Sequence, residues 1–244
     1  MTEQTGYLDL HSHILPGVDD GSKNWDMTMQ MLQMVYDQGV RHIVATPHNI
    51  PGHDKQDNGM IRALVEETNE RARQIAPDLE ILCGNEILYR RGIPEEIAAD
   101  HILTLSDSRY LLVEFYPGEL YLEVYQGLRE LIEAGYCPII AHMERVQALF
   151  EDEEKVWEVI KLGALIQVNT KSLMGGFFDR RSARLRKYIE KNMVHFLGSD
   201  CHNTAERSPL MKDCIEKLCK KLPESCLTRI LCENRDQFLQ KKYI

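Results

Sequence analysis

The chain has 244 residues, 43% of them hydrophobic, and a formal net charge of −9 at pH 7. This length suffices for one sizeable core, and the acidic balance excludes non-specific nucleic-acid binding, which needs a basic surface. No apolar run reaches the roughly 18 residues of a membrane span, and the first residues lack the pattern of a secretory signal, so we expect a soluble cytoplasmic protein without membrane insertion.

Short apolar runs alternate with longer helical patterns along the chain. The runs are rich in Val, Ile, Leu and Tyr, as strands buried on both faces are. The first helical pattern has Trp25, Met29 and Leu32 at helical spacing, and Gly39 follows as a stop. We expect the tail 209–244 to be helical and to pack on the outside. The predicted strands span residues 7–10, 41–46, 79–83, 110–115, 137–141, 164–168 and 194–198. The predicted helices span residues 24–38, 61–75, 119–134, 151–162 and 181–191.

This repeated alternation of strand and helix implies a parallel sheet. Seven such units favour a closed or nearly closed barrel over an open sheet, although the pattern alone leaves both open. No linker or internal repeat divides the chain, so we expect one domain over residues 1–244.

Residues of the metal-binding type follow nearly every predicted strand. Asp9, His11 and His13 are two residues apart and therefore share one face of the first strand, where the two imidazoles can hold one ion. Glu114 is the most informative, because it continues an apolar strand, where an unpaired carboxylate is costly. The carboxyl ends of parallel barrel strands form one mouth, where such enzymes place their active sites. The candidate metal ligands are His11, His13, Asp20, His48, Glu86, Glu114, His142, Asp200 and His202.

Imidazoles and carboxylates without a thiolate suit manganese, iron or zinc. These ligands are too many for one ion, so we expect two or three ions, and paired ions are a common device for displacement at phosphorus. Three divalent ions outweigh the four carboxylates among the ligands, so the filled site can attract a phosphate although the chain is acidic. The end of the sixth strand, Val168-Asn169-Thr170, is polar but offers no obvious ligand.

Residues 9–23, Asp-Leu-His-Ser-His-Ile-Leu-Pro-Gly-Val-Asp-Asp-Gly-Ser-Lys, resemble the opening of one branch of the PHP (polymerase and histidinol phosphatase) superfamily. That branch contains manganese-dependent protein-tyrosine phosphatases of bacterial capsule and exopolysaccharide loci. The similarity continues through Ala45-Thr-Pro-His48, Gly84-Asn-Glu86, Val113-Glu114-Phe115, Ala141-His142-Met-Glu-Arg145 and Gly198-Ser-Asp200-Cys-His202. It implies a distorted (β/α)7 barrel of PHP type, with parallel strands and outer helices, that hydrolyses phosphotyrosine in proteins.

The resemblance also implies three divalent ions, with manganese preferred and iron or zinc as alternatives. The implied ligands are His11, His13, Glu86 and Asp200 for the first ion, His48, Glu86, Glu114 and His142 for the second, and Asp20 and His202 for the third, with Glu86 bridging. Arg145 and Arg207 would bind the phosphate. His142 is a weaker candidate for a proton donor, since a metal-bound histidine has no free lone pair. The implied partner is a phosphotyrosyl protein, namely a bacterial autophosphorylating tyrosine kinase that controls polysaccharide chain length.

Two positions depart from the family pattern. The family often has a histidine or basic residue where this chain has Asn49, so the loop 49–59 would recognise substrate differently, with His53 and Lys55 as candidates to compensate. Cys201 stands where the family usually has a small residue. The sequence leaves open whether Cys201 has a redox role and whether copies of the chain assemble.

Alternative interpretations remain. The segment from Cys201 to Arg207 fits the Cys-x5-Arg spacing of thiol-based tyrosine phosphatases, but it has no glycine and places Glu206 beside the arginine, so we interpret the match as accidental. A small-molecule phosphatase of the histidinol-phosphate kind, a phosphodiesterase, an amidohydrolase or a non-catalytic metal-binding partner of a kinase would use the same scaffold. Asp9 is expected to orient a ligand histidine, and the alternative for Asp19 is an exposed turn carboxylate.

Overall fold

The structure, a computed structural model, describes residues 6–50, 57–176 and 179–244. His53 and Lys55 therefore lie outside the described residues. All seven predicted strands are present, and two short strands, β3 and β5, were not predicted. The strands are β1 (Tyr7–Ser12), β2 (Val40–Ala45), β3 (His48–Asn49), β4 (Glu80–Cys83), β5 (Glu86–Leu88), β6 (Tyr110–Glu114), β7 (Cys137–Ile140), β8 (Leu165–Asn169) and β9 (Phe196–Gly198).

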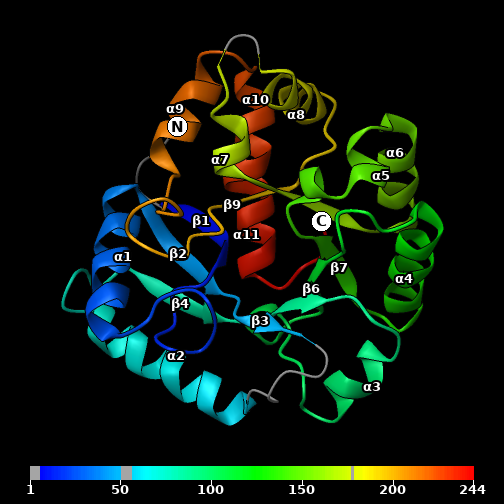
Figure 1. Ribbon diagram of the computed structural model, residues 1–244. Coiled ribbons are helices and arrows are strands. Elements are labelled where there is room, and N and C mark those ends of the chain that lie inside the picture. Colours follow the sequence, from blue (N-terminus) through cyan, green and yellow to red (C-terminus); the bar gives the residue numbers. More distant parts are fainter. Residues whose placement is uncertain (1–5, 51–56, 177–178) are drawn as a thin grey trace.

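The strands form a parallel ring (Figure 1). One sheet has the order β1-β2-β4 and the other the order β3-β5-β6-β7-β8-β9. Strand β9 returns to β1, where Ser12 and Cys201 form a bridge and the Asp200 amide donates to the His11 carbonyl oxygen at 2.8 Å. Since β3 follows β2 and β5 follows β4 after a two-residue break, the ring has seven strand positions. The fold is thus the predicted distorted (β/α)7 barrel.

Helices surround this ring (Figure 1). Four of the five predicted helices agree with the structure within two residues, whereas the helix predicted over 61–75 begins and ends three residues earlier. Its start is fixed by Asp57, whose side chain accepts a hydrogen bond from the Gly59 amide. The helices are α1 (Trp25–Asp37), α2 (Asn58–Ala72), α3 (Ile93–Ala98), α4 (Tyr121–Glu133), α5 (Gln147–Phe150), α6 (Glu153–Leu162), α7 (Thr170–Leu173), α8 (Arg180–Glu190), α9 (Lys212–Cys219), α10 (Glu224–Thr228) and α11 (Asn234–Leu239). Shorter helical segments are η1 (Leu105–Asp107), η2 (Met143–Arg145) and η3 (Arg229–Glu233).

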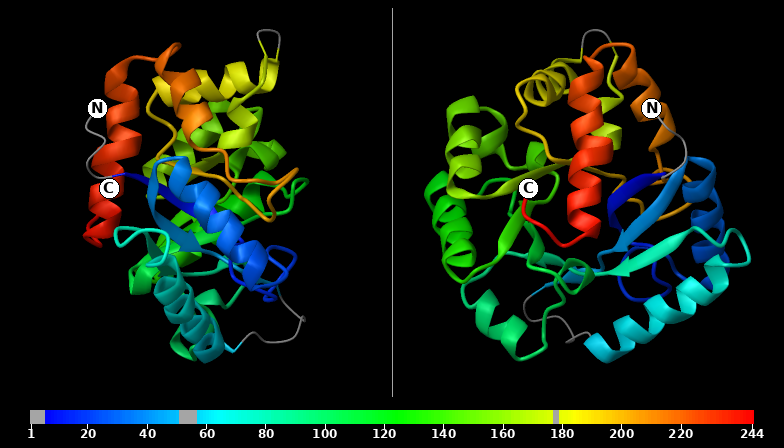
Figure 2. Two further views of the ribbon diagram at one scale, coloured as in Figure 1. Left: turned by 90° about the vertical axis from the view of Figure 1, so that its left-hand side faces the viewer. Right: turned by 180° about the vertical axis from the view of Figure 1, so that it is seen from behind.

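The C-terminal tail closes one end of the barrel. It is helical, as predicted, but its expected position on the outside is wrong for α11. Phe238 is fully buried in the cluster that fills the barrel, with its ring centroid 5.4 Å from that of Tyr110 and 5.9 Å from that of Phe196. Figure 2 shows α11 lying across the rear of the barrel. The opposite end of the barrel is formed by the carboxyl ends of the strands, and the candidate site lies there.

No helix within the described ranges has the length and apolar character needed to cross a lipid bilayer.

Candidate metal centre

The carboxyl ends of the strands bring all nine predicted ligands together. They form four overlapping groups, and within each group the candidate ligand atoms lie within 4.8 Å of one another. The groups are His13, Asp20, His48 and His202; His11, Glu86 and His142; His11, His13 and Asp200; and His48, Glu86 and Glu114.

His11 and His13 direct the same ring nitrogen at each other, with 3.1 Å between their Nε2 atoms. The Nδ1 atom of His13 lies 2.7 Å from Asp19 Oδ2, and that of His11 lies 3.4 Å from Gln167 Oε1. Because both partner oxygens accept, each Nδ1 carries a proton, and Nε2 is the atom of each ring that is left to bind a metal ion. Two ring nitrogens at this distance need a positive charge between them, and either a proton or a metal ion can supply it.

Glu86 of β5 lies at the centre of the cluster and is 1% exposed. Its Oε2 atom is 3.2 Å from His11 Nε2, 3.3 Å from His13 Nε2 and 3.0 Å from His48 Nδ1. Its Oε1 atom is 2.8 Å from His142 Nε2. Burial alone would raise the pKa of Glu86, but the imidazoles around it hold that pKa well below its ordinary value. A buried, ionised carboxylate among ring nitrogens has the position expected of a bridging ligand.

Positive charge is also stabilised at His13. Burial would lower its pKa, but hydrogen bonds with Asp19 and Glu86 raise it to about 10. Glu114 shows the converse, because burial and the nearby charge of Glu86 raise its pKa. The carboxylates of Glu86 and Glu114 repel each other, and the His13 ring beside Glu86 stabilises positive charge. Such a site favours the binding of divalent cations.

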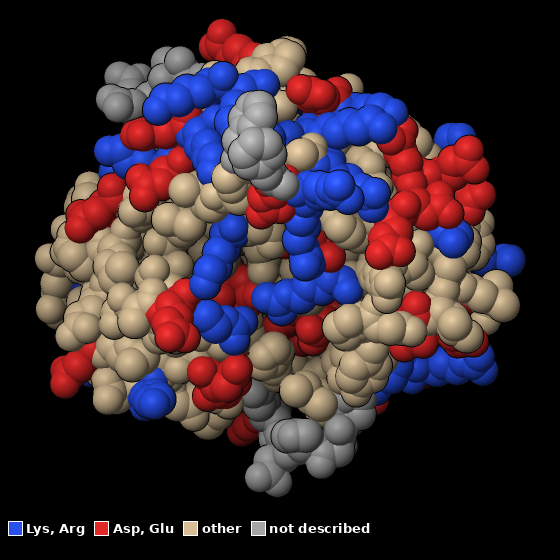
Figure 3. Space-filling model, turned by 45° about the horizontal axis from the view of Figure 1, so that its top comes forward, with Lys and Arg blue, Asp and Glu red and all other residues tan. Residues whose placement is uncertain are grey.

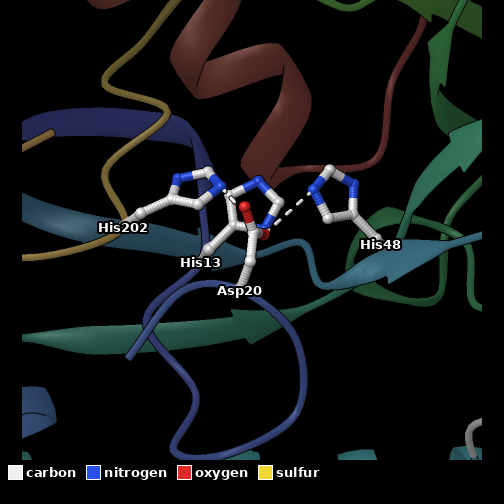
Figure 4. Close-up of side chains that lie close together, drawn as sticks. All are labelled: His13, Asp20, His48 and His202. Carbon is white, nitrogen blue, oxygen red and sulfur yellow. Dashed lines mark ion pairs between the residues drawn. The ribbon is translucent and has the colours of Figure 1, made fainter. Parts of the chain in front are cut away.

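A second part of the cluster faces solvent. Asp20, whose side chain is 62% exposed, places Oδ1 3.3 Å from Nε2 of His48 and 3.3 Å from Nε2 of His202 (Figure 4). His13 lies between these rings, with its centroid 3.9 Å from that of His202. The pair Asp20 and His202, implied for a third ion, is thus joined by two further histidines.

The predicted phosphate-binding arginines stand beside Asp200. Arg145 donates to Asp200 Oδ2, and Arg207 Nη2 donates to Oδ1 at 2.9 Å. Burial would raise the pKa of Asp200, but His11 and Arg145 lower it below its usual range. The side chains of Arg145 and Arg207 are 40% and 37% exposed, so both can reach a ligand at the mouth.

Sequence reasoning missed the role of β8. The His142 amide donates to Gln167 Oε1 at 2.6 Å, Gln167 Nε2 donates to Asn169 Oδ1 at 2.9 Å, and Asn169 Nδ2 donates to Asp200 Oδ2 at 2.8 Å. Since a backbone amide can only donate, it fixes the orientation of both side-chain amides. A glutamine inside an otherwise apolar strand was the available signal, because buried amides need partners.

Asp19 and Asp9 also differ from expectation. The alternative of an exposed turn carboxylate is wrong for Asp19, whose side chain is 6% exposed and accepts from the Gly21 amide as well as His13. Asp9 accepts from the backbone amides of Ser199 at 2.8 Å and His11 at 3.4 Å, rather than from an imidazole ring. The ring-orienting role expected of Asp9 therefore belongs to Asp19.

Cys201 is fully buried, and burial raises the pKa of its thiol well above the ordinary value. Because the thiolate is the nucleophile, this environment opposes the Cys-x5-Arg interpretation.

A parallel barrel with imidazoles and carboxylates at the carboxyl ends of its strands defines the class of barrel-type metal-dependent hydrolases. The same fold occurs in the phosphotriesterase homology protein of Escherichia coli, with a TM-score of 0.61 and 14% identity over 96% of this chain and 98% of that one. It also occurs in the histidinol phosphate phosphatase of Lactococcus lactis, with a TM-score of 0.59 and 16% identity over 88% of this chain and 93% of that one.

The model of the family described as "Capsular polysaccharide synthesis, CpsB/CapC" matches residues 7–240, and the chain belongs to this family. It is 33% identical to the tyrosine-protein phosphatase CpsB of Streptococcus pneumoniae over 97% of this chain and all of that protein. It is 30% identical to the tyrosine-protein phosphatase YwqE of Bacillus subtilis over 97% of this chain and 93% of that protein. A crystal structure from work on YwqE and CpsB, described as unique metal-dependent tyrosine phosphatases, matches with a TM-score of 0.87 and 30% identity over 97% of this chain and 96% of that one. The resemblance inferred from the opening motif is confirmed.

Proposed function

We propose that this chain is a metal-dependent protein-tyrosine phosphatase that hydrolyses phosphotyrosine at the carboxyl mouth of the barrel. The observation that carries the proposal is the convergence of the His11 and His13 Nε2 atoms beside the buried carboxylate of Glu86. The tyrosine phosphatase activity named for CpsB and YwqE supports the substrate assignment.

The nine clustered side chains would hold three divalent ions. Their oxygen and nitrogen donors fit manganese, which we propose, and would also accept iron or zinc. When bound, such ions supply Lewis acidity and a nucleophile made from water near neutral pH. Asp19 and Gln167 contact Nδ1 of His13 and His11, so that Nε2 of each ring would be the atom that binds an ion.

Arg145 and Arg207 would bind the non-bridging oxygens of the phosphate. A guanidinium presents a planar fork of donors that matches phosphate oxygens, and Asp200 holds both forks at the mouth. The phenolate of tyrosine leaves readily because its conjugate acid has a pKa near 10, so little acid catalysis is needed. His142 Nε2 faces Glu86 at 2.8 Å, so we assign this ring to ion binding before proton donation.

The proposed substrate is a phosphotyrosyl protein, namely a bacterial autophosphorylating tyrosine kinase that controls polysaccharide chain length. The family's description, capsular polysaccharide synthesis, supports this choice. We further propose that residues 1–244 form one domain and that it acts in the cytoplasm. The relatives at 30% identity or more are named tyrosine-protein phosphatases, which favours this substrate over a small molecule.

The test is an assay of the manganese-reconstituted protein on matched phosphotyrosyl and phosphoseryl peptides, with histidinol phosphate and a bis-aryl phosphodiester alongside. We expect turnover of the phosphotyrosyl peptide that a chelator abolishes, that Glu114→Gln reduces and that Cys201→Ser retains. Glu123→Gln, an exposed change on α4, is the matched control. Faster turnover of phosphoserine or of either small molecule, or loss of activity in Cys201→Ser with metal still bound, would contradict the proposal.

A further inference from the structure

Two cations outside the predicted site adjoin the arginines at its mouth. Lys171 Nζ donates to the Glu206 carbonyl oxygen at 2.7 Å, and Glu206 precedes Arg207 in the chain. Arg181 donates to the Glu144 carbonyl oxygen, and Glu144 precedes Arg145. We call these four cations, Arg145, Lys171, Arg181 and Arg207, the basic arc. In Figure 3, Lys and Arg side chains gather on this face around a hollow in which carboxylates lie.

Within the described ranges, Lys171 and Arg181 of the basic arc have no acidic partner. Among the described residues, the hydrogen bonds donated by the side chains of Lys171 and Arg181 go to backbone carbonyl oxygens, and neither forms an ion pair with a carboxylate. Two nearby carboxylates are engaged elsewhere, since Asp179 caps α8 and Glu144 accepts from the Asn169 amide. Both cations are exposed, and the Arg181 guanidinium lies 5.4 Å from the centroid of the Phe150 ring, so each can pair with a ligand that approaches the mouth.

Two members of the basic arc contact the candidate metal ligands, and the other two do not. Arg145 and Arg207 both contact Asp200 and thus lie at the proposed ions. Lys171 of α7 and Arg181 of α8 instead contact the backbone of Glu206 and Glu144, one residue before each arginine. A polypeptide carrying phosphotyrosine would place its neighbouring side chains there.

We propose that Lys171 and Arg181 bind acidic side chains that flank the phosphotyrosine, so that the enzyme prefers acidic phosphopeptides. The inference rests on the proposed function and adds a specificity determinant to it. Electrostatic attraction by the arc also explains how a chain of net charge −9 receives an acidic segment, because local fields at a cleft direct the encounter.

The test compares kcat/KM for phosphotyrosyl peptides of one length whose flanking residues are Glu, Gln or Lys. An exposed ion pair changes such a ratio by about 1.5 to 5-fold, so two pairs predict a preference for Glu over Lys of about tenfold in the unmodified protein. In Lys171→Glu/Arg181→Glu we expect peptides with Lys flanks to have a higher kcat/KM than peptides with Glu flanks. In Lys171→Gln/Arg181→Gln we expect the three peptides to have similar values. Acidic residues in the first turn of a helix are favourable, so the reversal at α7 and α8 should leave the fold intact.

The matched control is Arg73→Glu/Lys161→Glu, which changes net charge equally at the carboxyl ends of α2 and α6, away from the mouth. It should keep the preference for Glu, and a small aryl phosphate without flanks should be hydrolysed equally by all variants. Equal kcat/KM for all flanks in the unmodified protein, or equal effects of the control and the arc variant, would overturn the inference while aryl phosphate turnover upholds the proposed function. Absence of turnover of every substrate would overturn both.

Discussion

Gln167 and Asn169 lie behind the side chains that face the mouth, both at most 5% exposed. Their amides form one directed chain from the His142 backbone to the Asp200 carboxylate. Gln167 Oε1 also faces His11 Nδ1, so the same amide sets the tautomer of a candidate ligand. A histidine presents a defined nitrogen to a metal only when its other nitrogen is held in this way.

We predict that Gln167→Met, which keeps the side chain's size but not its hydrogen bonds, weakens metal binding about 10 to 100-fold with the fold retained. Metal content after dialysis and calorimetric titration with manganese measure the effect directly, without reference to activity. Gln147→Met, on the exposed surface of α5, is the control. Unchanged metal affinity in Gln167→Met would show that the amide chain has no positioning role.

His195, outside the metal centre, links stability to pH. Burial, together with the charge of Arg229, lowers its pKa to about 4 from 6.5, and its Nδ1 accepts from the Ile166 amide at 3.1 Å. Between these two pKa values the unfolded chain binds the proton and the folded chain does not. The contribution of His195 to the free energy of unfolding is therefore fully present above pH 6.5. It is lost as the pH falls towards 4, and the total loss is about 3 kcal/mol.

We predict that His195→Asn, which can still accept the Ile166 hydrogen bond, loses stability more gently over this pH range. Urea unfolding at pH 4 to 7 would measure it, and the difference between the two proteins should change by about 3 kcal/mol. Parallel curves for the two proteins would exclude His195 as the titrating group.

At the scale of single elements, β9 approaches its neighbours so closely that only glycine fits at its end. A Cβ atom at Gly198 would lie 2.7 Å from Gln167 Nε2 and 2.7 Å from His11 Cβ. Neither neighbour can retreat without moving the candidate ligands, because Gln167 is held by the His142 amide.

We predict that Gly198→Ala costs about 1–3 kcal/mol of stability and lowers metal affinity at the same time, because the added methyl overpacks a full site. Denaturant unfolding and metal titration together check this. Gly118→Ala is the control, because a Cβ atom there meets nothing within 4 Å, and it should change neither stability nor metal affinity. A Gly198→Ala protein with unchanged metal affinity would mean that β9 does not set the ligand geometry.

At the scale of the whole molecule, the two ends of the barrel differ in the side chains that occupy them. Phe238 of α11 belongs to the apolar cluster inside the barrel, whereas the imidazoles and carboxylates gather at the carboxyl ends of the strands. The candidate ligands come from β1, β3, β5, β6 and the segments after β1, β7 and β9, so ions bound there would join distant parts of the ring. Binding that selects the folded state adds to its stability by mass action.

We therefore predict that chelation lowers the melting temperature while the circular dichroism spectrum of the folded protein persists, because the apolar core forms without ions. At free manganese about 100-fold above its Kd, the added stability is about 2.7 kcal/mol. Melting curves across a manganese titration measure it, with calcium as a comparison for a harder ion. A melting temperature independent of manganese would contradict ion binding at the mouth.

Local sequence signals predicted the framework well. Apolar runs predicted the seven main strands, and Gly39, at φ 82°, ends the first helix region as expected. The short strands β3 and β5 were not predicted, because two or three residues are too few to show an alternating pattern. The start of α2 was misplaced because the cap at Asp57 was overlooked.

The sequence by itself determined the parallel sheet, the family and the set of candidate ligands, because strand patterns, motifs and residue type are local properties. The barrel followed from the family resemblance, since the strand pattern alone left an open sheet possible. Only the tertiary structure decided which side chains stand behind that set. Asp19, Gln167 and Asn169 orient the candidate ligands, and Phe238 fills the barrel. These roles depend on hydrogen bonds and packing between residues far apart in the chain, such as His142 with Gln167, and strand pairing alone brings those residues together.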